Sequence, residues 1–308
     1  MRDGKDHGDS LAEDLAMMNA LVARRRALKW FAGAGTAALV SGCGGDSGSS
    51  SGTSSVSVVS GSPATATPTA TATATATATP TPTATATATG SACLVDPTET
   101  AGPYPADGTN TASGSTSNAL AVSGIVRSDI RSSFISSTTV ATGVQVRITL
   151  TLVNVNASCA PLAGYAVYLW HCDRNGLYSL YSVAAESYLR GVQVTDANGQ
   201  VTFTTIFPAC YDGRWPHMHF EIFSSVANAI GGKYSILTSQ LAMPAALCTT
   251  IFADTATYPS SRTNFARVSL SNDNVFGDNS AAQLAQQTPA FVAAATGYTA
   301  SALIGIAR

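Results

Sequence analysis

Residues 44–92 most constrain what this chain can fold into, because they cannot contribute to a hydrophobic core. The stretch begins rich in Ser and Gly and continues as an Ala-Thr repeat that prolines interrupt. Strict alternation is typical of a β-strand, but neither face here carries a large apolar side chain to offset the entropy lost on ordering. We therefore predict a flexible linker between a leader, residues 1–43, and one folded region, residues 93–308.

The leader has the order of parts that is typical of export signals. An arginine cluster, residues 24–26, precedes an apolar run, residues 30–40, which is too short to span a bilayer. The cluster resembles the twin-arginine export pattern, and the segment ending at Cys43 resembles a lipobox, whose cysteine is acylated after cleavage. An ordinary secretory signal with an unrelated cysteine is the alternative. We expect an exported protein that is secreted or held at the cell envelope by a lipid on Cys43, with no other membrane contact.

Charge and cysteine content restrict the partners and the chemistry further. The formal net charge is −2, and the folded region has no lysine run or basic patch, which argues against nucleic acid as a partner. Five cysteines follow Cys43, and export permits disulfides, although the odd number leaves at least one thiol unpaired within the chain. Cys172 and Cys210 either form a bridge or remain a pair of inert buried thiols.

Short β-rich runs separated by turn residues dominate the folded region, which predicts an all-β fold, a β-sandwich with long loops. The Asn198-Gly199 turn predicts a hairpin between residues 191–195 and 201–205. Helical signals are scarce, and only residues 281–295 favour a short helix, which Pro289 interrupts. The predicted strands are 121–127, 144–153, 165–171, 201–206, 217–223, 234–241 and 265–270.

The segment 217–223 carries the clearest functional signal. His217 and His219 are two residues apart in an alternating run, so both imidazoles point to the same face of a strand and can hold one metal ion. Of the other two histidines, His7 lies in the leader, and His171 lies on a different segment, whose alternation leaves it out of the site. The pair therefore predicts a metal site.

A tyrosine and an arginine precede this pair closely. Tyr211 lies six residues before His217, and the turn at Asp212-Gly213 lets its phenol approach the imidazoles. Phenolate and imidazole together suit ferric iron, whereas zinc sites generally use histidine, cysteine or carboxylate. Arg214 supplies a fixed positive charge that lowers a phenol pKa or stabilises an oxyanion.

Several segments together resemble the intradiol ring-cleavage dioxygenases, ferric enzymes that split catechols between the two hydroxyl-bearing carbons. The resemblance runs from about Cys93 to Leu241, and its strength lies in several motifs agreeing in order and spacing. These motifs are the Gly-Pro-Tyr signature within 97–104, the Asp-Ile-Arg element within 126–131, the strand and turn 161–179, the hairpin 189–208 and the Arg-x-x-His-x-His-Phe block 214–220.

The resemblance implies a role for each matching residue. The iron ligands would be Tyr178, Tyr211, His217 and His219. Tyr211 would be the tyrosinate that a catechol displaces and that acts as a base as it leaves. Arg214 would stabilise charge developing on the substrate, and Gln240 would lie near the substrate. The implied cofactor is Fe(III) with no organic cofactor, and the implied partners are a small aromatic diol and O2.

Two other functions are compatible with parts of this pattern. A non-catalytic exported lipoprotein with a β-sandwich for binding or adhesion would have the same low charge and long linker. A hydrolase with another metal at His217 and His219 would not need Tyr178, so the position of Tyr178 relative to the histidines distinguishes it from the dioxygenase. Trp170, Trp215 and Glu186 are expected to be structural or pocket-lining.

Overall fold

The computed structural model describes residues 93–112, 115–230, 232 and 234–308. The predicted leader with Cys43 and the predicted linker lie outside these residues. Within the part of the chain that is described, no helix combines the length and the apolar character needed to cross a membrane.

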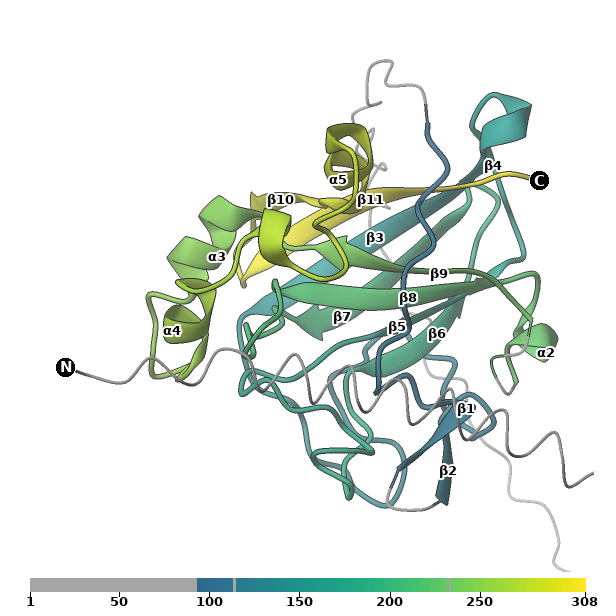
Figure 1. Ribbon diagram of the computed structural model, residues 1–308. Helices are drawn as coiled ribbons and strands as arrows, with labels where there is room; N and C mark the ends of the chain where they lie inside the picture. The colour runs from purple at the N-terminus through teal and green to yellow at the C-terminus, as the bar shows by residue number, and fades with distance from the viewer. Residues whose placement is uncertain (1–92, 113–114, 231, 233) are drawn as a thin grey trace, which may run out of the picture. The chain divides into compact units, whose positions relative to one another are not determined.

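The fold is a β-sandwich, and one of its two main sheets carries the histidine pair (Figure 1). This sheet has the strand order β6-β5-β8-β9, and all neighbours are antiparallel. The histidine strand lies inside the sheet, because β5 and β9 pair with it on either side. The strands are β5 (Ala166–Trp170), β6 (Arg190–Val194), β8 (His217–Phe223) and β9 (Ser235–Ala242).

The second sheet is built around its longest strand, β3. The order β10-β11-β3-β4 continues along one path, and β7 also pairs with β3. The β3–β11 pair is parallel, whereas the other pairs are antiparallel. The strands are β3 (Gln145–Asn154), β4 (Ala160–Pro161), β7 (Gln200–Ile206), β10 (Ala290–Ala293) and β11 (Tyr298–Ile306).

The remaining elements outside the two sheets are short helices and one hairpin. The hairpin pairs β1 (Asp107–Ala112) with β2 (Ser115–Asn118). Most of the helical residues follow the last strand of the histidine sheet. The helices are η1 (Val155–Ala157), α2 (Val226–Ala229), α3 (Ala245–Ile251), α4 (Ser261–Phe265), η2 (Leu270–Asn272) and α5 (Ala281–Gln287).

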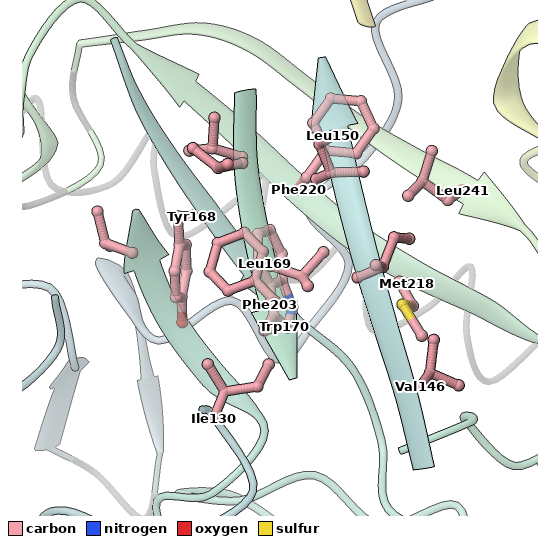
Figure 2. Close-up of a cluster of buried hydrophobic side chains, with 14 of the residues drawn as sticks. Ile130, Val146, Leu150, Tyr168, Leu169, Trp170, Phe203, Met218, Phe220 and Leu241 are labelled. Atoms are coloured by element: carbon pink, nitrogen blue, oxygen red, sulfur yellow. The ribbon is translucent and has the colours of Figure 1, made fainter. Parts of the chain in front are cut away.

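The core between the sheets receives one face of β8 and leaves the histidines on the other. Met218 and Phe220 are fully buried in the apolar cluster that also contains Leu150 of β3 and Phe203 of β7, as Figure 2 shows. Burial of a side chain such as Phe220 contributes roughly 1.5–3 kcal/mol. Since successive strand residues point to opposite faces, this packing fixes the direction of both imidazoles.

Most of the predicted strands are present, and two are not. Five predicted runs correspond within one residue at either end to β3, β5, β7, β8 and β9. Residues 121–127 instead form turns with an isolated bridge at Val126, and residues 265–270 run from the end of α4 through a turn to the start of η2. The predicted helix is present as α5, but the chain beyond Pro289 continues as β10 and not as helix.

The predicted hairpin between residues 191–195 and 201–205 is wrong. The turn exists, with Gly199 at φ +71° and the Asp196 amide donating to the Gln200 carbonyl at 3.0 Å. However, β6 pairs with β5, and β7 pairs with β3 in the other sheet. The turn therefore connects the two sheets, because both strands gain more pairing and burial with other partners.

The cysteines settle the alternatives left open by the sequence. Cys93 forms a disulfide with Cys159, which closes a loop with a sequence separation of 66. Cys172 and Cys210 do not form a bridge, and both are buried free thiols, as is Cys248. Burial raises the pKa of the Cys210 thiol to about 12, so this group is inert at neutral pH.

Candidate metal centre

The two histidines of β8 converge on one point. Their Nε2 atoms lie 3.0 Å apart, and both residues are buried. His217 Nδ1 donates to the Trp215 carbonyl, which leaves the Nε2 lone pair free for an acid or a metal. Trp170, directly opposite on β5, stacks on the His219 ring with centroids 4.9 Å apart and planes 8° from parallel, so this ring is held in place.

Tyr178 reaches the same point from the long loop between β5 and β6. The loop turns tightly because the Asp173 carboxylate accepts the amides of Asn175 and Leu177, and Gly176 adopts φ +83°. The Tyr178 hydroxyl then lies 3.4 Å from Nε2 of one histidine and 3.2 Å from Nε2 of the other. Tyr178, which distinguishes a tyrosine-containing centre from a simple histidine pair, therefore lies next to both histidines.

Tyr211 completes the cluster from the segment that leads into β8. Its hydroxyl lies 3.3 Å from His217 Nε2. Helix α4 fixes the preceding residue, because the Cys210 amide donates to Ser261 Oγ and the Cys210 carbonyl accepts from Asn264. Unlike Tyr178, which is almost fully buried, Tyr211 is partly exposed.

The four polar atoms have the spacing of ligands around one ion. At metal–ligand distances of about 2.1 Å, neighbouring ligand atoms are roughly 3.0 Å apart in octahedral and roughly 3.4 Å apart in tetrahedral geometry. The contacts above, 3.0 to 3.4 Å, fall in this range. Within the described residues, no group of three or more His, Cys, Asp or Glu side chains could hold a metal, so the two tyrosines are essential to this centre.

Electrostatics favour a cation at this point. Burial lowers the pKa of His217 to about 3, and burial together with His217 holds the pKa of His219 well below its ordinary value. Both imidazoles are therefore neutral ligands at pH 7. Burial raises the pKa of the phenols of Tyr178 and Tyr211, so they would ionise at neutral pH only beside a cation. This donor set fits ferric iron, which binds phenolate strongly.

Arg214 lies beside the cluster in a network of hydrogen bonds. Its Nη2 donates to Gln240 Oε1 at 2.8 Å, and its Nε donates to Asp273 Oδ2 at 2.9 Å. Gln240 in turn donates from Nε2 to the Thr100 carbonyl at 2.9 Å. Burial raises the pKa of Asp273, but Arg214 together with the Trp215 and Val275 amides more than offsets this, so the pKa of that carboxyl lies below its ordinary value. The pair is therefore ionised in the folded protein.

An N-terminal strap, residues 96–105, covers the histidine face of the sheet (Figure 1). A Cβ at Gly102 would lie 3.4 Å from His219 Cε1, and the Tyr104 ring stacks on Tyr178 with centroids 4.8 Å apart. Arg190, fully buried, donates to the Pro105 carbonyl and to the carbonyl of Ser179, next to Tyr178. This one side chain therefore fastens both the strap and the tyrosine loop to the sheet.

The structure brings together the six residues that the sequence singled out, and it adds others. Tyr178, Tyr211, His217 and His219 form the cluster, whereas Arg214 and Gln240 flank it. His171 stays outside, as expected, with Nε2 bonded to Thr205 Oγ1 at 2.7 Å.

Sequence reasoning missed Asp273 and the stacking of Tyr104. No local pattern marks Asp273, but Tyr104 lies in the Gly-Pro-Tyr signature and could have been found there. Of the residues expected to be structural, Trp215 packs in an apolar cluster with Phe276, and Glu186 bonds Ser133 away from the cluster.

Comparisons with known proteins give a family match and a shared fold. Residues 130–230 match the Dioxygenase_C family model, described as dioxygenase, and these residues include all four members of the cluster. No curated protein matches the chain.

Two solved structures share the fold. An intradiol ring-cleavage dioxygenase from Tetranychus urticae is 24% identical with a TM-score of 0.53, and the match covers 70% of this chain and 95% of that chain. A second dioxygenase crystal structure is also 24% identical with the same coverage and a TM-score of 0.52. The dioxygenase domain of a carbohydrate-binding fusion protein from Streptomyces sp. SirexAA-E is 20% identical, with 70% and 99% coverage and a TM-score of 0.43.

The family match covers the segment with the cluster, and the first two structures have the same β-sandwich over most of the described residues. The resemblance that the sequence motifs predicted is thereby confirmed: the folded part of this chain resembles the intradiol ring-cleavage dioxygenases in its family match and in its fold.

Proposed function

We propose that this protein is a non-haem Fe(III) dioxygenase that cleaves a catechol-type ring between its two hydroxylated carbons with O2 to give a muconate-type product. The observation that carries the proposal is the meeting of two phenol oxygens and two imidazole nitrogens at 3.0 to 3.4 Å. Histidine pairs alone are common, but the convergence of two phenol hydroxyls on such a pair supports a metal centre, because a buried hydroxyl such as that of Tyr178 is costly unless it has a polar partner.

Tyr178, Tyr211, His217 and His219 would hold the iron. Ferric iron would supply a Lewis acid and a template for the substrate and O2. The imidazoles are neutral and cannot move, because a backbone carbonyl fixes one and Trp170 stacks on the other. Tyr178, His217 and His219 are buried, so little water reaches this side of the cluster.

The two tyrosines differ in a way that suggests different roles. Tyr178 is buried and its ring stacks on Tyr104, so it would be the ligand that stays in place. Tyr211 is partly exposed and directly precedes the exposed Asp212-Gly213 turn, so it would be the ligand that a substrate displaces. Burial raises the pKa of its phenol, so a Tyr211 phenolate that had been ionised by a cation would readily accept a proton from a catechol hydroxyl once released.

Arg214 and Gln240 would act on the substrate side. The Arg214 guanidinium is fixed on two sides by hydrogen bonds and carries a permanent charge. A preorganised charge of this kind stabilises negative charge on a substrate without reorganisation during the reaction. Gln240 links Arg214 to the strap, because it accepts from Arg214 and donates to the Thr100 carbonyl.

An assay of O2 uptake and product formation tests the proposal. Full-length protein loaded with Fe(III) is supplied with a panel of catechols. We expect one O2 to be consumed for each ring-opened product, and we expect zinc-loaded protein to be inactive. A binding or adhesion protein would bind a catechol without consuming O2. Hydrolysis of esters by zinc-loaded protein would instead favour the hydrolase.

We also propose that the enzyme works outside the cytoplasm, held by a lipid on Cys43 or secreted. The support is the order of the arginine cluster, the apolar run and the cysteine in the leader. Labelling with a radioactive fatty acid tests this, since Cys43→Ser should abolish the label. Label that persists in this variant would contradict the anchor.

A further inference from the structure

Asp273 is a buried charge that the proposed function does not yet use. It follows η2, beyond the part of the chain that matches the family model. Its side chain is fully buried, whereas the Arg214 side chain that it contacts is 13% exposed. Burial of a carboxylate costs free energy unless hydrogen bonds or an opposite charge satisfy it, so the partners of Asp273 indicate its role.

Hydrogen bonds to Asp273 come from two parts of the site. Oδ2 accepts from Arg214 Nε at 2.9 Å and from the Trp215 amide at 2.7 Å. Oδ1 accepts from the amides of Val275 and Phe276 at 2.9 and 3.1 Å. The two backbone hydrogen bonds to Oδ1 fix the orientation of the Asp273 carboxylate, so Oδ2 stays directed at Arg214.

The Asp273 carboxylate is also connected to His217, through the backbone of Trp215. The Trp215 amide donates to Asp273, and the Trp215 carbonyl accepts from His217 Nδ1. The backbone from Arg214 to His217 is thereby fixed between Asp273 and the metal centre. Displacement of Asp273 would therefore move the arginine first and the histidine only through this backbone.

Arg214 is left with one free edge. Its Nε and Nη2 are bonded to Asp273 and Gln240. Among the described residues, Nη1 has no hydrogen-bond partner. The guanidinium lies beside the cluster, because Gln240, which accepts from Nη2, is paired with His219 across β8 and β9. Two of the three nitrogens are thus used for anchoring, and the third is available to an anion at the cluster.

We infer that Asp273 is a positioning residue, which holds the Arg214 guanidinium so that Nη1 faces the anionic substrate. The inference rests on the proposed function for the identity of that anion. Asp273 also offsets the charge of Arg214 when no substrate is present. Substitution of Asp273 should therefore lower kcat for the substrate, while the four metal ligands stay in place.

The chain offers a matched control for this ion pair. Asp212 pairs with Arg267 at the same distance, 2.9 Å, but their side chains are 80% and 56% exposed. The substitution Asp212→Asn makes the same chemical change one residue after Tyr211. An exposed pair contributes little, so this variant should behave as the wild type does.

The test compares Asp273→Asn, Arg214→Met and the double variant in full-length protein. Asp273→Asn should keep its iron and lower kcat for catechol cleavage at least about tenfold, with a smaller change in KM. The double variant should be no slower than Arg214→Met within about twofold, because Asp273 acts through Arg214. An iron-loaded Asp273→Asn variant within about twofold of wild type, or losses that multiply in the double variant, would overturn the inference.

A second measurement needs neither activity nor an Asp273 variant. In the NMR spectrum of metal-free protein, the Arg214 Nε–H signal, assigned with Arg214→Met, should exchange slowly with water. Exchange as fast as that of exposed Arg267 would overturn the inference. Wild-type protein that neither binds nor cleaves any catechol would overturn the proposed function, and the exchange rate would still decide whether Asp273 holds Arg214.

Discussion

Gly176 lies directly against Tyr211, so that a Cβ at position 176 would come within 2.8 Å of the Tyr211 Cβ. The glycine also adopts φ +83° in the turn that delivers Tyr178. One residue without a side chain therefore permits both tyrosines to reach the histidines.

The substitution Gly176→Ala should damage the metal centre. The new methyl group must displace Tyr211 or the loop of Tyr178, and the backbone strain adds about 1 kcal/mol. We expect at least a tenfold loss of affinity for Fe(III), measured by titration of metal-free protein. Gly164→Ala is the control, because Gly164 has φ +82° and nothing lies within 4 Å of its Cβ position. Equal iron affinity in the two variants would contradict this account.

Removal of the Tyr178 hydroxyl should cost iron binding without unfolding the protein. The substitution Tyr178→Phe keeps the ring stack with Tyr104 and deletes only the oxygen near the two histidines. We expect iron content after purification to fall severalfold, measured by elemental analysis. Tyr181→Phe is the matched control, since that hydroxyl bonds Asn110 and the Ala106 amide and not the cluster. Iron retained in full by Tyr178→Phe would remove this tyrosine from the ligand set.

Reduction of the disulfide should weaken the fold where the strap begins. The Cys93–Cys159 bridge closes a loop with a sequence separation of 66. A loop of this length corresponds to about 4 kcal/mol of unfolding free energy in the chain-entropy account. The double variant Cys93→Ser/Cys159→Ser should lose about that amount in urea unfolding. An unchanged midpoint would show that the bridge contributes nothing to stability.

Asp96 should make the protein less stable as the pH rises from about 4 to about 6. Burial raises the pKa of its carboxyl from 3.8 to about 6, although Gly305 and Gln286 donate to it. The folded state thus binds the proton more tightly than the unfolded state, so stability from this group is complete below about pH 4 and is lost as pH rises to 6. The loss is at most about 3 kcal/mol.

Asp96→Asn tests this directly, because the amide stays neutral at every pH. Urea unfolding at pH 4, 5, 6 and 7 should show that the variant gains stability relative to wild type as the pH increases. Parallel curves for the two proteins would mean that Asp96 does not titrate in this window.

The sequence predicts the histidine strand well, because two strong signals coincide there. Alternation separates Met218 and Phe220, which pack in the core, from His217 and His219, which meet Tyr178 on the other face. Every residue of the strand is buried, so the alternation is one of polarity and not of burial. The four cluster residues were also predicted, because each lies in a motif with defined spacing. Local patterns of this kind are sufficient wherever the local and tertiary preferences agree.

Where the two preferences differ, the sequence misleads. The Asn198-Gly199 turn is real, but Phe203 faces Ile148 of β3, so β7 belongs to the other sheet. Strand β11 pairs in parallel with β3 from the far end of the chain, and no local pattern marks that partner. Asp273 likewise meets Arg214 only through the fold, 59 residues apart in sequence.

The visible absorption spectrum of full-length protein loaded with Fe(III) tests the central claim most directly. We expect a tyrosinate-to-iron charge-transfer band that moves to longer wavelength when catechol is added without oxygen. His219→Ala should lack this band. Wild-type protein that binds no ferric iron, or binds it without a charge-transfer band, would contradict a centre built from Tyr178, Tyr211, His217 and His219.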